Sequence, residues 1–246
     1  MLISQKLLER IQEKKRRLDS LRPFNTLQLQ QIKENFVVEY VYNSTSMEGN
    51  TLTLNETKLI LQEGITIGGK SLREHLDVTN QKEAMLFIEA FVKDKKEITE
   101  ADILALQRIT LKGISDYWAG RYKTSENRVV GSRHKTAPPS KVKSEMQSLV
   151  HVMRKNSKNY HPVELAALAH HELVRIHPFV DGNGRTARLL NNLILMSQGY
   201  VPIIIRTKDR KKYFDCLEKA HFEHKAPFVE FVGRRVEEAI FHYITA

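Results

Sequence analysis

The sequence predicts an all-α fold, a helical bundle that carries one small β-hairpin. Apolar residues recur at helical spacing along most of the chain. Residues 120–141 break this period with turn formers, a β-branched pair and two prolines, which is typical of a hairpin followed by a loop. Of the 246 residues, 41% are hydrophobic and 28% are charged, as in a globular domain. No apolar run approaches the roughly 18 residues that a membrane span needs.

The first half of the chain is expected to hold five helices. Gly49 supplies a stop for the second helix, and Thr53 and Glu56 have the spacing of a capping box that starts the third. Thr99 and Asp102 resemble another cap. In chain order, the expected helices run through Leu7–Leu18, Leu27–Met47, Thr53–Gly64, Val78–Val92 and Ile103–Leu111.

The second half is expected to begin with the hairpin, which contains Val129 and Val130 and turns near Gly131. Further along, Pro162 in a first helical turn and Glu164 near its third position mark a helix start. The expected helices of this half run through Lys141–Arg154, Pro162–Ile176, Arg188–Met196, Tyr213–His221 and Phe228–Tyr243.

Charge and cysteine content limit the classes of partner and compartment. Lysine and arginine number 39 against 29 acidic residues, and the net charge of +10 favours anionic partners. Nucleic acid stays open on charge alone, although no zinc-finger or RNA-recognition signature accompanies the basic runs. Cys216 is the single cysteine, so no intrachain disulfide can form. This fits a reducing compartment, and we expect a cytoplasmic protein of a bacterium.

The stretch "HPFVDGNGRTAR", residues 177–188, has the composition of an anion site. It lies between two helical patterns, so it is expected to be a loop that enters a helix N-terminus, where unpaired N–H groups and the helix dipole favour an anion. Gly182 and Gly184 allow the backbone to approach a phosphate closely, and Asn183 tolerates the same geometry. Arg185 and Arg188 lie on one face of the first turn, which suggests a polyphosphate.

Two further side chains of this stretch carry chemistry. Asp181 can hold a Mg²⁺ shared with phosphate oxygens. His177 can take a proton from an incoming hydroxyl. A zinc hydrolase built on His170, His171 and His177 is a weaker interpretation, because no HExxH motif or carboxylate at ligand spacing is present.

The stretch resembles the signature of the Fic (Fido) family, H-P-F-x-D/E-G-N-G-R-x-x-R, at every specified position. The resemblance extends from about Asn43 to Val236. It implies a protein adenylyltransferase, which transfers AMP from ATP to a serine, threonine or tyrosine hydroxyl of a protein. It also implies a division into an N-terminal helical region (1–95) that contains an inhibitory helix, a catalytic core (96–236) and the end of a C-terminal helix (237–246).

The resemblance assigns roles residue by residue. His177 is the general base, and Phe179 packs the loop into the core. Asp181 binds Mg²⁺ (or Mn²⁺) at the α- and β-phosphates. Arg185 contacts the β-phosphate and Arg188 the γ-phosphate. The remaining nucleotide-binding positions of the signature are Gly182, Asn183, Gly184, Thr186 and Ala187.

Two other segments gain roles from the resemblance. The expected hairpin matches a flap that covers the site and aligns the target segment. The residues of the flap counted with the nucleotide site are Val130, Gly131, Ser132 and Arg133. Tyr213 and Phe214 fall where the family holds the adenine and its ribose. His221 falls where relatives often have asparagine, so the preference for ATP over other nucleotides stays open.

Ser44, Glu48 and Gly49 resemble the inhibitory motif of the family, S/T-x-x-x-E-G/N. The resemblance implies that Glu48 pairs with Arg188 and keeps the γ-phosphate from it. Ser44 lies one helical turn earlier and can brace Glu48. The expected protein is therefore an autoinhibited adenylyltransferase.

Several alternatives stay open. Glu48 could instead position a water that removes AMP from a modified protein, or the transferred group could be another nucleotide. Nucleic-acid binding is a further class that the net charge permits. The expected partner is a protein with an acceptor hydroxyl, of unknown identity, and self-modification is compatible with the chemistry. Residues 65–72 carry apolar side chains that could form a homodimer contact.

Overall fold

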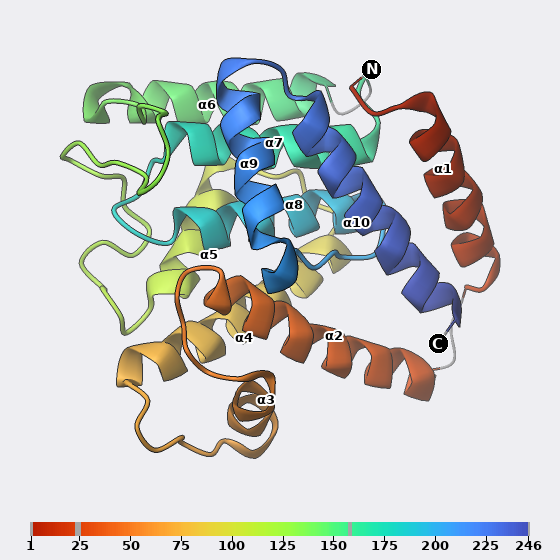
Figure 1. The fold of residues 1–246 in the computed structure, drawn as a ribbon, viewed down its shortest axis with the longest axis horizontal. Helices are drawn as coiled ribbons and strands as arrows, with labels where there is room; N and C mark the ends of the chain where they lie inside the picture. Colours follow the sequence, from red (N-terminus) through yellow and green to blue (C-terminus); the bar gives the residue numbers. More distant parts are fainter. Residues whose placement is uncertain (1, 23–25, 157–158, 246) are drawn as a thin grey trace.

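The computed structural model describes residues 2–22, 26–156 and 159–245. Its helices lie in the order expected from the sequence, joined by short connections apart from the long loop between α5 and α6 (Figure 1). The helices are α1 (Gln5–Ser20), α2 (Thr26–Ser46), α3 (Leu54–Glu63), α4 (Leu72–Lys93), α5 (Glu100–Leu111), α6 (Pro139–Asn156), α7 (Pro162–Ile176), α8 (Asn183–Ser197), the 3₁₀ turn η1 (Thr207–Asp209), α9 (Arg210–Phe222) and α10 (Ala226–Thr245).

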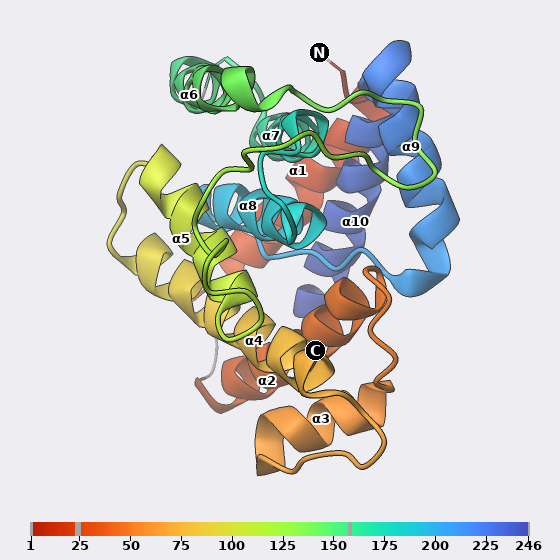
Figure 2. The same cartoon turned by 90° about the vertical axis from the view of Figure 1, so that its left-hand side faces the viewer.

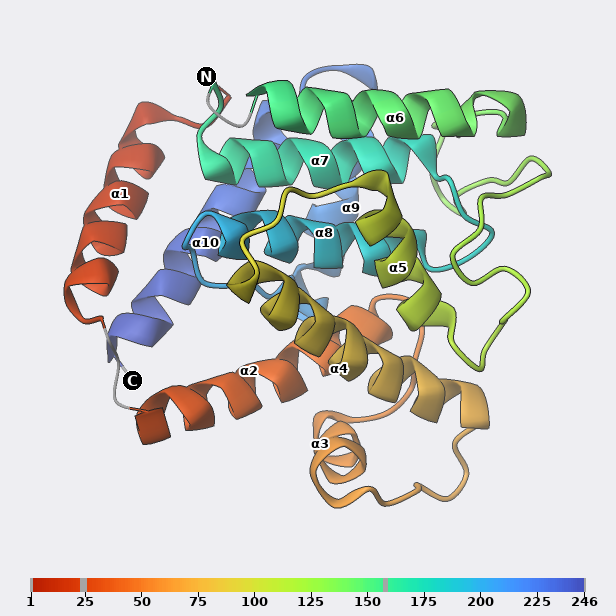
Figure 3. The ribbon, with the colours of Figure 1, turned by 180° about the vertical axis from the view of Figure 1, so that it is seen from behind.

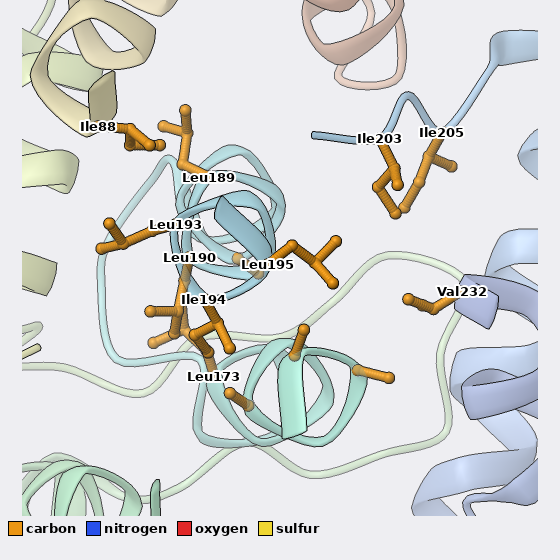
Figure 4. Close-up of a cluster of buried hydrophobic side chains, with 14 of the residues drawn as sticks. Ile88, Leu173, Leu189, Leu190, Leu193, Ile194, Leu195, Ile203, Ile205 and Val232 are labelled. Carbon is orange, nitrogen blue, oxygen red and sulfur yellow. The ribbon is translucent and has the colours of Figure 1, made fainter. Parts of the chain in front are cut away.

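Helix α8 is the centre of the molecule. Its residues from Arg185 to Leu195 are buried without interruption, and Figure 2 shows α7, α5, α4 and α10 arranged around it. A helix that is buried on all sides needs apolar residues all round, which "LLNNLILM" largely supplies. Figure 4 shows how this helix fills the core: Leu189 points toward Ile88, Ile194 toward Leu173, and Leu195 toward Val232.

The outer helices cover this centre in pairs. Helices α6 and α7 run side by side (Figure 3), and α1 packs on α10. The approach of α1 to α10 is close: a Cβ on Gly233 of α10 would lie 3.0 Å from the Leu7 side chain of α1. The backbone N–H of Ile3 donates to the buried Glu164 at 3.0 Å. The N-terminal segment is therefore joined to the rest of the bundle.

Most helix boundaries follow the capping signals in the sequence. Thr53 and Thr99 cap α3 and α5 with complete capping boxes, and Pro162 begins α7. Helix α4 starts six residues earlier than the expected Val78, because Ser71 and Glu74 form a further capping box. Helix α8 likewise starts at Asn183, within the signature.

The expected β-hairpin forms only in part. The long loop turns at its tip, where the Ser132 N–H donates to the Val129 carbonyl at 3.2 Å. Its arms are joined by side chains: Thr136 donates to the Asn127 carbonyl at 2.9 Å. No strand is present anywhere in residues 2–22, 26–156 and 159–245, so the prediction of strand pairing here was wrong. Side-chain bonds of Asn and Thr take the place of a backbone ladder.

No helix in the described part of the chain combines the length and apolar character of a membrane span.

Candidate active site

The signature loop connects α7 to α8 and is fixed by its own side chains. Phe179 is fully buried and stacks on Tyr122, with ring centroids 5.8 Å apart. The Asn183 side chain accepts a hydrogen bond from the Phe179 N–H and donates one to the Phe179 carbonyl, each at 2.9 Å. Phe179 therefore packs as expected, whereas the Asn183 amide holds the loop and leaves only its backbone N–H for an anion.

His177 ends α7 in a left-handed backbone conformation, with φ of 51°. This conformation is costly for a residue with a Cβ and is usually taken by glycine at a helix end. Burial lowers the pKa of His177 to about 4, and the nearby charge of Lys123 acts in the same direction. The imidazole is therefore neutral at physiological pH. Its Nδ1 is buried, so Nε2 is the nitrogen available to an incoming group.

The expected anion site lies at the N-terminus of α8. Gly182 caps the helix with φ of 81°, a conformation that favours glycine. Glu48 reaches this site from the end of α2: its Oε1 lies so close to Gly184 that a Cβ there would collide with it. The Glu48 carboxylate thus lies where unpaired N–H groups and the helix dipole favour an anion.

Arg188 is buried at 3% side-chain exposure and faces α2. Its NH2 group donates to Glu48 Oε1 and to the Ser44 carbonyl, each at 2.8 Å, and its Nε donates to the Ser44 hydroxyl at 3.1 Å. Gly49 follows at φ of 97° and ends the turn. Ser44 therefore binds Arg188 and does not brace Glu48 as its spacing predicted.

Ser44 is held in turn by Gln81 of α4, a residue that no motif in the sequence indicates. The Ser44 hydroxyl donates to Gln81 Oε1 at 3.2 Å, and Gln81 Nε2 donates to Thr110 at 3.3 Å. Gln81 and Thr110 are fully buried. A buried polar chain of this kind fixes one geometry, because each member would be costly to leave without a partner.

Replacing Gln81 by leucine is therefore expected to destabilise the fold by about 1–3 kcal/mol, because the buried Ser44 and Thr110 hydroxyls lose a partner. Urea denaturation of the wild type and variant measures this difference. Gln62→Leu, at an exposed position of α3, is the matched control and should lie within about 0.5 kcal/mol of the wild type. Equal stability of the Gln81 and Gln62 variants would contradict the expectation.

Arg185 lies in a second ionic cluster on the α4 side of the anion site. It is 3% exposed and bonds to Asp77 of α4 and to Asp181, the latter at 3.2 Å. The other Asp181 oxygen accepts from Arg73 at 2.5 Å. Burial opposes ionisation of Asp181, but Arg185, the Gly182 N–H and Arg73 together hold its pKa below the ordinary value.

Asp181 is also the residue that fits Mg²⁺. This ion keeps several waters and binds one or two carboxylates together with substrate phosphates, so one carboxylate beside an anion site is sufficient. Among the described residues, no group of three or more His, Cys, Asp and Glu side chains could hold a metal ion. His170 and His171 bond instead to the Tyr213 hydroxyl and to His221, at 2.8 and 3.1 Å.

The residues expected around the adenine are only partly accessible. Tyr213 is buried, whereas Phe214 is 37% exposed and lies under Arg210. His221 stacks on His134 of the long loop, with ring centroids 4.2 Å apart. Burial, followed by the charges of neighbouring histidines, lowers the pKa of His221 to about 3. This ring is neutral and could offer either a donor or an acceptor to a base.

Two signature positions do not present side chains to a ligand. Thr186 and Ala187 are fully buried in the core face of α8. These two residues are close to the site because they are neighbours of Arg185 and Arg188 in the sequence. Only their backbone atoms could contact a ligand.

The long loop between α5 and α6 lies across the molecule toward α9 (Figure 2). Its tip is open: Val130 is fully exposed, next to Gly131. On the α9 side, the Ser132 hydroxyl and the Arg133 N–H donate to Glu218 at 2.5 and 2.9 Å. These bonds attach the loop to α9, the helix that carries Tyr213 and Phe214.

Four site residues could not be found from the sequence because they lie in α4 or α9, outside any motif: Arg73, Asp77, Gln81 and Glu218. The sequence patterns that could have indicated these residues are weak. Asp77 interrupts an apolar pattern, and Arg73 places a cation in a helical first turn, where the dipole disfavours it.

Residues 97–195 match the family model of the Fic/DOC family. Among curated proteins, the protein adenylyltransferase Fic of Nematostella vectensis is 37% identical over 246 residues, which cover 99% of this chain and 57% of that protein. Protein adenylyltransferase fic-1 of Caenorhabditis elegans is 39% identical over 210 residues, 84% of this chain and 41% of that protein. The chain spans about half the length of the curated relatives it matches.

Solved structures agree with this match. A Fic domain containing signaling protein from Bacteroides thetaiotaomicron has a TM-score of 0.91 and 32% identity, with 96% of each chain covered. Fic-1 from C. elegans has a TM-score of 0.87 and 33% identity, covering 97% of this chain and 72% of that one. The curated relatives named above are animal proteins, so the expected bacterial source is not supported.

Proposed function

Because the chain belongs to the Fic/DOC family, we propose that it transfers AMP from ATP to a hydroxyl group of a protein, and that its structure is the inhibited state of this enzyme. The observation that carries the proposal is the position of Glu48, whose carboxylate lies on the α8 N-terminus and pairs with Arg188 at 2.8 Å. The site is thus built for an anion and is occupied by one from its own chain.

The proposed reaction forms a bond between the acceptor oxygen and the α-phosphorus and breaks the bond from that phosphorus to the β-phosphate oxygen. His177 Nε2 takes the hydroxyl proton. Pyrophosphate leaves, and the negative charge that grows on it lies beside the α8 N-terminus, Arg185 and Arg188. When bound at Asp181, Mg²⁺ would neutralise phosphate charge.

Inhibition follows from the geometry of one arginine. While Glu48 holds the Arg188 guanidinium, a γ-phosphate cannot bind there, and the negative carboxylate repels it. A triphosphate that binds elsewhere places its α-phosphorus out of line for attack, which is costly for a displacement. ATP soaked into crystals of the wild type and Glu48→Gly tests this directly: the γ-phosphate should reach Arg188 only in the variant.

The pH dependence of the uninhibited enzyme follows from the pKa of His177. A free histidine becomes protonated as pH falls through about 6.5 and is then no base. Because burial lowers the His177 pKa to about 4, the imidazole remains neutral down to that pH. The transfer rate of Glu48→Gly at saturating ATP is therefore expected to stay flat from about pH 8 to 5.5. Initial rates in buffers of constant ionic strength measure it, and a decline centred near pH 6.5 would contradict it.

Removal of AMP from a modified protein is the second candidate. It is favoured by one observation: Glu48 is 38% exposed and lies within the site, so its free oxygen could orient a water for attack. An AMP-modified protein incubated with the wild type and with Glu48→Gly separates the two functions. Loss of AMP only with the wild type would favour removal as the main reaction.

The acceptor is a protein hydroxyl, and modification of the chain itself is compatible with the proposal. A homodimer is proposed through residues 65–72, where Ile65 and Leu72 are 49% and 74% exposed. The base preference is proposed to be adenine, read beside Phe214 and His221. The catalytic core is proposed to comprise residues 96–236, with the inhibitory helix in residues 1–95.

A further inference from the structure

We propose that Arg73 occupies the position of the metal ion on Asp181 in the nucleotide-free protein and is displaced when the metal-bound nucleotide enters. This inference rests on the proposed function, because it assumes that Asp181 binds the metal of the nucleotide. It concerns a residue outside the signature and the inhibitory motif.

Both Asp181 oxygens are engaged in the structure. Oδ2 accepts from Arg73 NH2 at 2.5 Å. Oδ1 accepts from the Gly182 N–H at 2.6 Å and from Arg185 NH2 at 3.2 Å. The Oδ2 lone pairs are thus directed at a guanidinium, and a divalent cation could coordinate this oxygen only after the guanidinium has moved.

The two arginines on Asp181 differ in how firmly they are held. Arg185 is 3% exposed and also pairs with the buried Asp77, so its position is fixed from behind. Arg73 is 59% exposed. Within the described part of the chain, its ion pair is with Asp181 alone. Asp181 itself is 41% exposed. An exposed side chain with one such contact can swing away, whereas Arg185 cannot.

The position of Arg73 is not explained by the helix that carries it. It is the second residue of α4, after the cap Ser71, at the positive end of the helix dipole. A cation there is disfavoured, and the capping box already satisfies the helix end through Glu74. The Asp181 carboxylate across the site offsets this unfavourable position.

Competition between Arg73 and the metal has a measurable consequence. The metal has to break the ion pair between Arg73 and Asp181 before it can bind Asp181. An exposed pair of this kind contributes less than about 1 kcal/mol, so removing Arg73 should strengthen metal-dependent nucleotide binding by about two- to fivefold. The gain should appear only when the metal is present, because the substitution removes a positive charge that repels the divalent ion. If Arg73 instead bound the polyphosphate, its loss would weaken nucleotide binding in the presence of the metal.

Calorimetric titration of a non-hydrolysable ATP analogue tests this in the full chain carrying Glu48→Gly, so that Arg188 is free. The ratio of the dissociation constant in EDTA to that in excess Mg²⁺ is the readout, and it does not depend on activity. Arg73→Gln should raise this ratio about two- to fivefold, and Arg73→Lys should give a smaller increase. Arg16→Gln, at an exposed position of α1, is the matched control and should leave it unchanged.

An unchanged or smaller ratio in Arg73→Gln would overturn the inference while leaving the proposed function intact. Two other results would contradict the proposed function itself. Either the ATP analogue would not bind to Glu48→Gly, or Asp181→Ala would leave the ratio of the two dissociation constants unchanged. Either of these results would overturn the metal site at Asp181 and the role of Arg73 together.

Discussion

Glu48→Gly is expected to raise incorporation of labelled AMP about 100-fold over the wild type, because removal of the carboxylate frees Arg188 and the α8 N-terminus for the triphosphate. The size follows from the cost of misplacing the reacting phosphorus by about 1 Å, which is on the order of 100-fold in rate. Incubation with ATP labelled at the α-phosphate, followed by electrophoresis, measures transfer to the chain itself or to added protein.

Two controls separate this effect from a general loss of structure. Glu34→Gly introduces glycine at an exposed position of α2, the helix that precedes Glu48, and its labelling should equal that of the wild type. Glu48→Gln keeps the shape of the side chain but removes its charge, so it should give an intermediate increase. Labelling of Glu48→Gly at the wild-type level would refute autoinhibition by this residue.

The second large effect is expected from His177→Ala in the Glu48→Gly background. Loss of the general base should lower the transfer rate by about 100- to 10,000-fold, which returns labelling to the background of the assay. Because the imidazole is not part of the phosphate site, affinity for an ATP analogue should change little. The rate of transfer and the calorimetric affinity, measured on the same preparations, give both quantities.

His224→Ala is the matched histidine variant, at an exposed position after α9, and should retain the rate of the parent. Labelling that persists in the double variant, at a rate near that of Glu48→Gly, would show that another group accepts the proton. Joint loss of the rate and of nucleotide binding would instead indicate a structural role for His177.

The sequence predicted the fold wherever signals were local. The caps at Thr53 and Thr99 and the proline at the start of α7 are short-range patterns, and each begins a helix in the structure. The hairpin prediction was wrong in its strands, because β-branched residues indicate a preference for extended backbone but do not provide a partner strand. Here Asn127 and Thr136 join the arms through their side chains.

In the candidate site too, contacts between sequence neighbours could be predicted and contacts between distant residues could not. His177, Asp181 and the two arginines of the signature lie together between the end of α7 and the first turns of α8, because those residues are neighbours in sequence. Contacts such as that of Arg185 with Asp77, which are 108 positions apart, could not be predicted, since the spacing of charges along α4 does not indicate their partners. Likewise, the direction of the Asn183 side chain depends on the loop that it closes.

Arg188 keeps two hydrogen bonds to Ser44 that do not involve Glu48. Under the proposed inhibition, release therefore requires only a change of rotamer in the partly exposed Glu48 side chain, and α2 can remain docked while it happens. Rotamer changes of exposed side chains take picoseconds to nanoseconds, far faster than the departure of a helix. The active and inhibited forms should then share one radius of gyration and one hydrodynamic size, and a partner that activates the enzyme has to stabilise a rotamer rather than detach a helix.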